Sequence, residues 1–446
     1  MLKSINTFYL LLSVSLYIVL SLKISGEYLL INFSSILSVI SYYFILKTNF
    51  YLKNKFYKRK YLSIEVFIYS FVFIFFNNII SYYYNSNFFL FSEFDANFYH
   101  EITIKLLSMP LLDAIKHYLS IMPFEDLGMI LILYPLYHIV ESNLILNFFY
   151  MLVGVITALS LFKLSQNFMS KKYAFLSAIT YSLSSFVLFF HSIGLKESFM
   201  VMLVVLSFDY YHRSINKKNI IYLIYSLIFI SLIMLFRPAV SAIIIASIGL
   251  GVLLSKQRGY GVKFFSFLIL ISLVLMSNDL LIMLERYTGG GVDKLIQLKE
   301  AENMIKGGVY FTYAVNILAQ AIGPLPTLIS SEKTLLTFYA PGLIYRVLLS
   351  IPFWLGVVYI IKTKTYKLYP LTIFVILEMF ALLFLLEGLE LRKALPHIPI
   401  VFLIAFCFLD NYDNQKIKFK KIKRIKYFFK ISLFILAILI LYWNFK

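Results

Sequence analysis

Apolar runs of about 20 residues recur along most of this chain, and they constrain its fold more than any other feature. A run of that length can cross the hydrocarbon core of a bilayer as a helix, where every backbone hydrogen bond must be made internally. Of the 446 residues, 61% are hydrophobic and only 14% are charged, which is too apolar for a soluble domain. The sequence therefore predicts an all-α polytopic membrane protein.

The distribution of basic residues predicts which side of the membrane each segment faces. With the N-terminus in the cytoplasm, the predicted inner segments hold most of the 41 lysine and arginine residues, as the positive-inside rule requires. This places a bacterial chain in the cytoplasmic (inner) membrane, with large extracytoplasmic segments at about 84–142 and 284–340 and basic cytoplasmic loops at 47–60 and 410–426. We predict one integral membrane domain, 1–446, with about thirteen transmembrane helices: 6–23, 28–46, 61–83, 143–163, 173–192, 194–211, 219–236, 239–255, 262–283, 341–361, 368–386, 394–409 and 427–444.

Composition also narrows the classes of function. The formal charge of +19 is explained by the basic inner loops, so we expect no nucleic-acid partner. The single cysteine, Cys407, excludes an internal disulfide and a cysteine metal cluster. The chain has no G-x-x-x-x-G-K-[ST] run for a nucleotide phosphate. We therefore expect chemistry at the outer face, on a substrate that the membrane delivers.

The stretch FSEFDANFYHEI, residues 91–102, concentrates polar groups on the first large outer segment. Asp95 and Tyr99 are four residues apart, so a helix would place them on one face, and His100 follows directly. Asp95 is then either a helix cap or a catalytic group, acting as a general base or a metal ligand. We predict Asp95 and His100 as the catalytic residues and Tyr99 as a substrate contact.

Charged residues at other outer turns suit an anionic substrate. Lys196 and Glu197, in HSIGLKESF, are either a pair reaching for the membrane surface or a cation for phosphate with its orienting acid. Arg237, in LFRPAV, is predicted on the outer side, where the positive-inside rule disfavours arginine. An anionic partner would explain its position. A run of three glycines, Gly289–Gly291, is either a phosphate-binding loop before a helix or a hinge. The predicted diphosphate-binding residues are Tyr99, Lys196, Glu197, Arg237, Arg286, Glu390, Arg392 and His397.

Several of these motifs resemble those of GT-C-type membrane glycosyltransferases. The resemblance rests on DANFY in the outer segment, YPLY at 134–137, GLKES at 194–198 and ELRKALPHIP at 390–399, and it covers about 90–410. Two departures are an extra helical hairpin before the acidic segment and the lack of a soluble C-terminal domain. The size, the predicted span count and the tyrosine- and phenylalanine-rich composition also resemble bacterial O-antigen and capsule repeat-unit polymerases.

This resemblance implies transfer of a glycan from an undecaprenyl-linked oligosaccharide to a sugar hydroxyl of another lipid-linked repeat. Asp95 would take the hydroxyl proton or hold a metal, and His100 would orient or replace it. Lys196, Arg237 and Arg392 would neutralise the diphosphate leaving group, so no metal is required, although a divalent metal remains an alternative. A chain-length regulator and a flippase are the expected partners.

Two other functions remain open at this stage. One is a transferase that adds a single sugar from a polyprenyl-phosphate donor. The other is a flippase or transporter of lipid-linked glycans, although such proteins often carry internal repeats and polar groups near mid-membrane. Polar groups gathered at one face, with no internal repeat, favour an enzyme.

Overall fold

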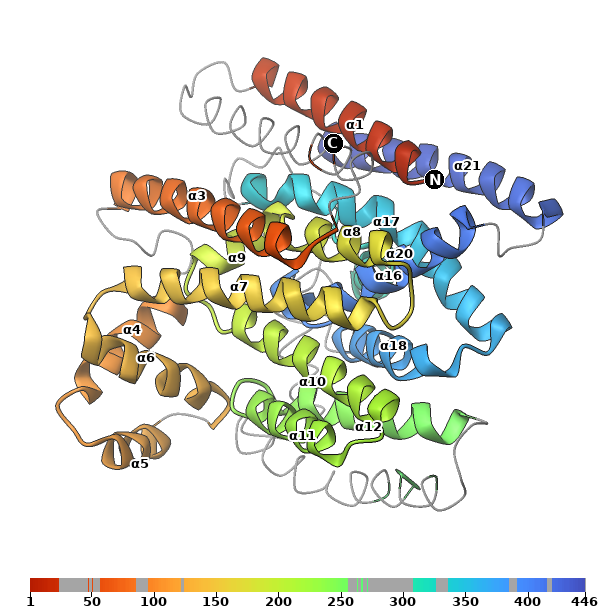
Figure 1. The fold of residues 1–446 in the computed structure, drawn as a ribbon. Coiled ribbons are helices and arrows are strands. Elements are labelled where there is room, and N and C mark those ends of the chain that lie inside the picture. The colour runs from red at the N-terminus through yellow and green to blue at the C-terminus, as the bar shows by residue number, and fades with distance from the viewer. Residues whose placement is uncertain are drawn as a thin grey trace.

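The protein is a bundle of helices in the computed structural model, which describes residues 1–23, 57–85, 95–121, 124–255, 308–325, 336–384, 391–414, 419–445 and the isolated positions 47, 50, 263, 266, 267 and 271 (Figure 1). Within these ranges there is no strand, which confirms the predicted all-α class. The helices up to residue 165 are α1 (Leu2–Lys23), α3 (Arg59–Asn85), α4 (Asp95–Leu106), α5 (Leu111–Ile121), η1 (Phe124–Asp126), α6 (Leu127–Ile139) and α7 (Asn143–Ser165). Those that follow are α8 (Lys171–Ser182), α9 (Ser185–Ser192), α10 (Glu197–Lys217), α11 (Ile220–Met234), α12 (Pro238–Leu254), α16 (Gly308–Ile322), α17 (Leu336–Thr363), η2 (Tyr366–Leu368), α18 (Tyr369–Phe384), α19 (Leu391–Ala394), α20 (Ile398–Asp413) and α21 (Phe419–Phe445).

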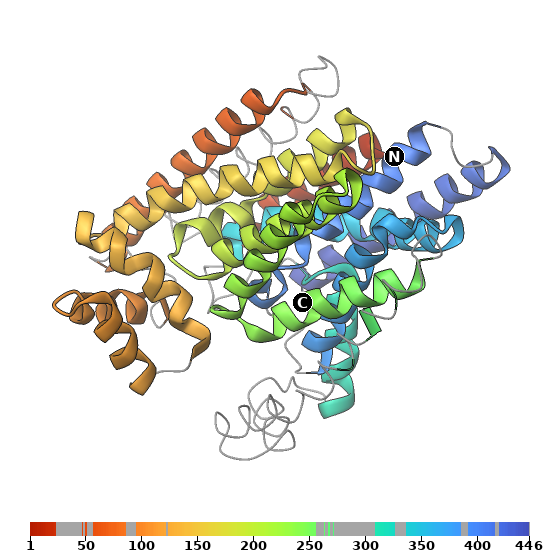
Figure 2. The same cartoon turned by 60° about the horizontal axis from the view of Figure 1, so that its bottom comes forward.

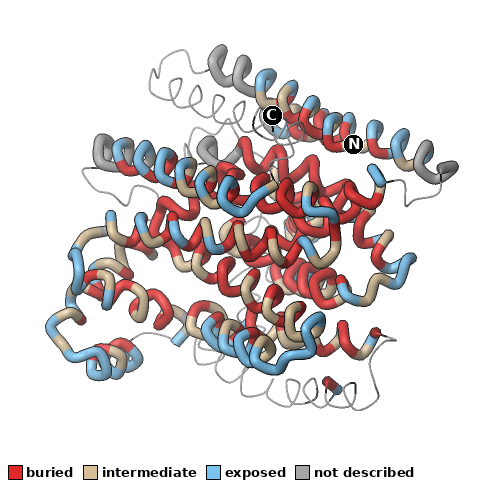
Figure 3. The backbone as a smooth tube through the Cα atoms, viewed as in Figure 1, coloured by how far each residue is buried: buried red, intermediate tan, exposed pale blue. Residues whose placement is uncertain are grey.

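Helix α20 lies at the centre of the bundle. Every residue from Ile398 to Asn411 is buried, and the helix packs against α17 and α8 (Figure 3). Its far end is tied to the start of α8, because the Asp410 carboxylate accepts hydrogen bonds from the backbone N–H and the hydroxyl of Ser170, at 2.8 and 2.7 Å. A helix that is apolar all round is stable only when it is surrounded by other elements or lipid.

The outer helices expose large apolar side chains. Phe71 and Phe75 on α3, Ile224 and Leu227 on α11, and Phe434 on α21 are all exposed. Figure 3 shows pale blue segments along these outer helices. In water such patches would favour association, whereas lipid tails solvate them without cost. The exposed faces therefore fit a bundle embedded in a bilayer.

Four described helices are long and apolar enough to cross a membrane: Leu144–Ser165, Pro341–Thr363, Tyr366–Phe384 and Arg424–Trp443. Helices α8 and α9 together make a fifth candidate. Four shorter apolar helices accompany them within the described residues. The predicted spans 28–46 and 262–283 lie almost wholly outside the described residues, so the count of thirteen stays a prediction.

The predicted single helix 173–192 is wrong in one respect: it is broken into α8 and α9, which meet at an angle of 50°. Ser184 donates its hydroxyl hydrogen bond back to the Thr180 carbonyl, a contact that competes with the helical ladder. On the other side of the break, the Ser185 hydroxyl accepts the backbone N–H of Gly342 in α17 at 2.8 Å. A side-chain carbon on Gly342 would lie 2.9 Å from the Ser185 nitrogen, so glycine permits this close approach.

Helices α4, α5 and α6 form a separate lobe at one end of the bundle (Figures 1 and 2). The lobe has its own small apolar core, which includes Ile102, Tyr118 and Ile130. It docks on the α11–α12 turn, where the Gly128 N–H donates to the Leu235 carbonyl at 2.9 Å. This contact brings the residues before α6 close to Arg237, the last residue before α12.

Candidate active site

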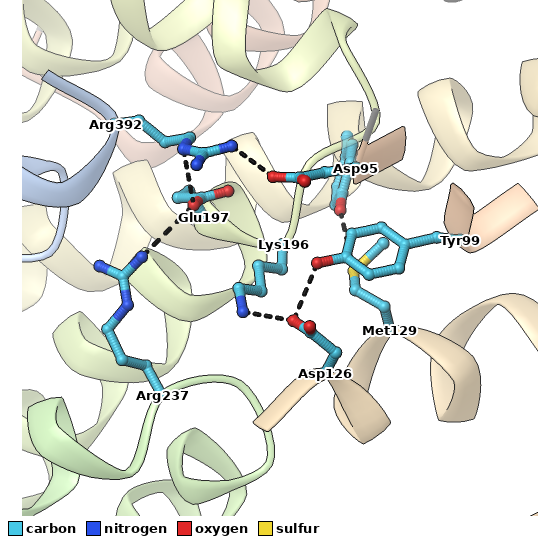
Figure 4. A network of polar contacts seen from close by, with 9 residues as sticks. Asp95, Tyr99, Asp126, Met129, Lys196, Glu197, Arg237 and Arg392 are labelled. Atoms are coloured by element: carbon cyan, nitrogen blue, oxygen red, sulfur yellow. Dashed lines mark hydrogen bonds and ion pairs between the residues drawn. The ribbon is translucent and has the colours of Figure 1, made fainter. Parts of the chain in front are cut away.

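Asp95, in the first turn of α4, forms an ion pair with Arg392 of α19, although 297 positions separate them in the chain (Figure 4). The Asp95 side chain is 44% exposed and that of Arg392 is 36% exposed. A carboxylate in the first helical turn is also favoured by the helix dipole. Asp95 is therefore held by a cation yet stays accessible to a substrate.

Glu197, the first residue of α10, lies between two arginines (Figure 4). Its Oε1 atom is 3.7 Å from Nε of Arg392 and 3.6 Å from Nη2 of Arg237. The glutamate side chain is only 2% exposed, so its charge is compensated mainly by these two guanidinium groups. Glu197 thus links α19 to the turn before α12 and holds both arginines at one place.

A tight turn places Lys196 and Glu197 at this position. Gly194 has φ +73°, a left-handed conformation that glycine adopts without strain, and it allows the chain to reverse between α9 and α10. The buried Tyr150 of α7 donates a 2.7 Å hydrogen bond to the Leu195 carbonyl, which fixes the turn from the opposite side.

Asp126, at the end of η1, is part of the same network and was not predicted from the sequence. It forms an ion pair with Lys196 and accepts a 2.8 Å hydrogen bond from the Tyr99 hydroxyl (Figure 4). Burial raises the pKa of Tyr99, and the charge of Asp126 adds to the shift, so this phenol stays protonated and acts as a donor. The available signal was an acidic residue directly before the apolar run LGMILILY on a predicted outer segment.

The structure brings together six of the predicted site residues, Asp95, Tyr99, Lys196, Glu197, Arg237 and Arg392, with Asp126 as a seventh. We name this group the outer cluster. Its three carboxylates and three cations balance in formal charge. Their roles in a reaction stay predictions.

His100 faces a different direction from Tyr99. Its Nδ1 atom is 2.7 Å from the hydroxyl of Tyr137 in α6, and the two rings meet edge to face. Burial lowers the pKa of His100 and raises that of Tyr137, so the pair is neutral near pH 7. The contact joins α4 to α6, which suits a supporting residue.

The remaining predicted residues do not join the outer cluster through contacts that the structure describes. His397 precedes α20 and is 2% exposed, and its Nδ1 atom has no hydrogen-bond partner. Arg286, Glu390 and the glycines Gly289–Gly291 lie outside the described residues.

A metal ion is the alternative partner that the sequence predicts for Asp95. Among the residues that the structure describes, no group of three or more histidine, cysteine, aspartate or glutamate side chains is arranged to hold a metal ion. The described partner of the Asp95 carboxylate is the Arg392 guanidinium. The geometry thus gives Asp95 an arginine partner, and a metal at this position stays a hypothesis.

Part of the chain is similar to a known protein family. Residues 132–282 match the model of the dolichyl-phosphate-mannose-protein mannosyltransferase family. The match covers about a third of the chain, from α6 through α12, and includes Lys196, Glu197 and Arg237. No curated protein matches the chain. The match supports a GT-C-type membrane glycosyltransferase.

Proposed function

We propose that this protein transfers a sugar from a polyprenyl-phosphate-linked donor to a hydroxyl acceptor at the outer face of the bacterial cytoplasmic membrane. The observation that carries the proposal is the chain of ion pairs from Asp95 through Arg392 and Glu197 to Arg237. These side chains come from α4, α19, α10 and the turn before α12, so separate parts of the fold converge on one polar site. The family match supports glycosyl transfer as the reaction class.

In the proposed step, the acceptor oxygen forms a bond with the anomeric carbon of the donor sugar. The bond from that carbon to the phosphate oxygen breaks, and its electron pair leaves with the lipid phosphate. Asp95 takes the proton of the acceptor hydroxyl, as its 44% exposure allows a sugar to approach the carboxylate. Charge therefore builds up on the phosphate as it leaves.

The cations of the outer cluster stabilise that charge. Lys196, Arg237 and Arg392 are held by carboxylates before substrate binds, so their positions are set in advance. Preorganised cations contribute most where charge develops in the transition state. Asp126 holds Lys196 in place, and Tyr99 of α4 in turn donates a hydrogen bond to Asp126.

The donor class is the finer part of the proposal. The matched family is named for a sugar carried on a lipid monophosphate, which favours transfer of one sugar from a polyprenyl-phosphate donor. Polymerisation of O-antigen or capsule repeat units on undecaprenyl diphosphate is the second candidate, supported by overall architecture alone. In that case a flippase and a chain-length regulator would be partners.

The glycan profile of a deletion strain tests these alternatives. Loss of one sugar from each repeat supports the single-sugar transferase, whereas chains limited to one repeat support the polymerase. Loss of all surface repeats, with lipid-linked repeats retained inside the cell, would favour a flippase and contradict the proposal. Complementation with Asp95→Asn then tests whether the outer cluster carries the activity.

A further inference from the structure

A pocket lies at the end of α10 that is opposite to the outer cluster. It has a volume of about 160 Å³ and lies between the last turns of α10, the end of α12, and η2 with the start of α18. Its polar lining residues are Tyr211, His212, Ser255, Tyr366 and Lys367. Helix α10 begins at Glu197 of the outer cluster and has 21 residues, so it extends about 30 Å, the thickness of the hydrocarbon layer. The pocket is therefore at the level of the other membrane surface.

Two loops that are predicted to be cytoplasmic contribute to this pocket. His212 and Ile215 line it from the loop 212–218, and Tyr366 and Lys367 line it from the loop 362–367. Together the two loops hold six lysine and arginine residues and no aspartate or glutamate. The anionic lipids of an inner leaflet attract basic segments of this kind. The charge around the pocket therefore favours an anionic ligand.

Lys367 is the cation that lines the pocket. The described partner of its Nζ atom is the Oδ1 atom of Asn216 at 3.3 Å, a neutral amide oxygen. Lys196 and Arg213 form ion pairs with carboxylates, whereas none of the described ion pairs includes Lys367. The residue is exposed, so an anion can reach its ammonium group from the membrane surface.

The walls of the pocket are formed by packed helices. His212 and Ser255 are 2% and 7% exposed, and their side chains are of types that donate hydrogen bonds to phosphate oxygens. The His212 ring meets the Phe168 ring edge to face, with 4.9 Å between the ring centroids, which restricts its orientation. A side-chain carbon on Gly251 would lie 2.6 Å from Cγ of Pro370, so glycine permits α12 and α18 to touch here. The polar lining groups are thus held in place before a ligand binds.

The apolar part of the lining indicates that the anion belongs to a lipid. Ile215 and Val252 line the pocket beside the polar groups. Leu254 and Ile361, which lie near the lining residues in the chain, are each 57% exposed. A free phosphate ion gains nothing from such side chains, whereas acyl chains cover them favourably. Tyrosines such as Tyr366 are also typical of the interface between a membrane and water.

We propose that this pocket binds the headgroup phosphate of an anionic phospholipid from the inner leaflet. A water molecule occupies roughly 30 Å³ in the liquid, so the pocket has room for a phosphate group. Lys367 pairs with the phosphate, His212 and Ser255 donate hydrogen bonds to it, and the acyl chains lie on the apolar surface beside Leu254. This site is separate from the outer cluster and takes no part in the proposed transfer.

Lipid binding to the purified full-length protein tests the proposal. Native mass spectrometry is used to titrate phosphatidylglycerol, which is anionic, and phosphatidylcholine, which has the same phosphate but no net charge. The proteins are wild type, Lys367→Glu and the control Lys362→Glu, which makes the same charge change on an exposed residue in the last turn of α17, outside the pocket lining.

We expect Lys367→Glu to bind phosphatidylglycerol about 10- to 30-fold more weakly, because the local charge changes by two. Lys362→Glu should lose no more than about 3-fold, since the pocket lining is unchanged and salt screens exposed charges. Binding of phosphatidylcholine should be weaker in wild type and similar in all three proteins. If Lys367→Glu does not accumulate, Lys367→Gln is titrated instead, with an expected loss of about 5-fold.

Thermal unfolding in detergent provides a second measurement and separates a lipid from a free anion. A lipid that binds the folded state should raise the melting temperature of wild type and Lys362→Glu, and should raise that of Lys367→Glu much less. Inorganic phosphate alone should leave all three melting temperatures unchanged and should not displace phosphatidylglycerol. Stabilisation by inorganic phosphate together with displacement of the lipid would assign the pocket to a soluble anion and overturn the proposal.

Three other results would overturn the proposal. They are wild-type affinity for phosphatidylglycerol in Lys367→Glu (or in Lys367→Gln, if that variant is the one measured), equal affinity of wild type for the two lipids, and an equal loss in Lys362→Glu, which would show that the surface charge attracts the lipid without a specific site. None of these measurements uses sugar transfer, so the result is independent of the proposed function.

Discussion

Replacing Arg392 by alanine should abolish sugar transfer while leaving the fold intact. Arg392 contacts Asp95 and lies 3.7 Å from Glu197, but both members of the Arg392–Asp95 pair are more than a third exposed. Solvent screens such a pair, which contributes at most about 1 kcal/mol to stability. The buried Glu197 loses one cation but keeps the Arg237 guanidinium at 3.6 Å, so its charge stays compensated. For a chain of this size, that loss corresponds to a melting-temperature shift of no more than about 2 °C.

The expected effect on the reaction is much larger. Removing one preorganised group that stabilises developing charge typically costs about 10²- to 10³-fold in rate. Arg392→Lys keeps the charge but loses the two-pronged geometry, so we expect it to recover only part of the rate. The change in activity therefore exceeds anything that the change in stability could explain.

Both quantities are measured on purified protein. Transfer is followed in proteoliposomes that contain a polyprenyl-linked donor, and unfolding is followed by melting in the same detergent used for purification. Lys393→Ala, at the next residue of α19, is the matched control and should keep wild-type transfer. Wild-type transfer by Arg392→Ala would refute the role given to this arginine, and a melting-temperature loss well beyond 2 °C would refute the stability reasoning.

Three further predictions concern other residues. Burial lowers the pKa of His100, so the folded state disfavours its charged form, and stability should fall as the pH drops below about 6.5. The melting temperature of His100→Gln should therefore depend less on acid pH than that of wild type. An unchanged pH dependence would contradict the assignment. Asp126→Asn removes the charge that holds Lys196 but can still accept the Tyr99 hydrogen bond, so we expect a partial loss of transfer rate. Asp126→Ala loses both contacts and should lose more of the rate. Wild-type rates in both variants would exclude Asp126 from the site. The charge distribution predicts that a reporter fused after Lys105 lies outside and one after Lys60 lies in the cytoplasm, and a cytoplasmic report at Lys105 would place the outer cluster on the wrong side.

The positions of many helices could be predicted because long apolar runs leave the backbone little choice in a membrane. The predicted ranges 61–83 and 143–163 correspond closely to α3 and α7. The break between α8 and α9 could not be predicted, because it depends on Gly342, which lies more than 150 positions away in the chain. Such contacts leave no signal in the local pattern.

Six residues of the outer cluster stand among the predicted site residues, but their pairing could not be predicted. The predicted topology puts Asp95, Glu197, Arg237 and Arg392 on one side of the membrane, and such a placement allows them to lie close together. That Glu197 lies between two arginines depends on how α10, α19 and the α11–α12 turn pack. Asp126 was missed because acidic residues directly before an apolar helix usually indicate no more than a helix start.

Substitution of Asp95 by asparagine is the most direct test of the central claim. Asparagine keeps the shape of the side chain and serves equally well at a helix N-terminus, but it cannot take a proton at neutral pH. The account predicts that Asp95→Asn lowers the transfer rate in proteoliposomes by about 10²- to 10⁴-fold at a wild-type membrane level. Asp113→Asn, in the first turn of α5 in the same lobe, should keep the wild-type rate. A wild-type rate in Asp95→Asn would show that this carboxylate is structural and would contradict the proposed mechanism.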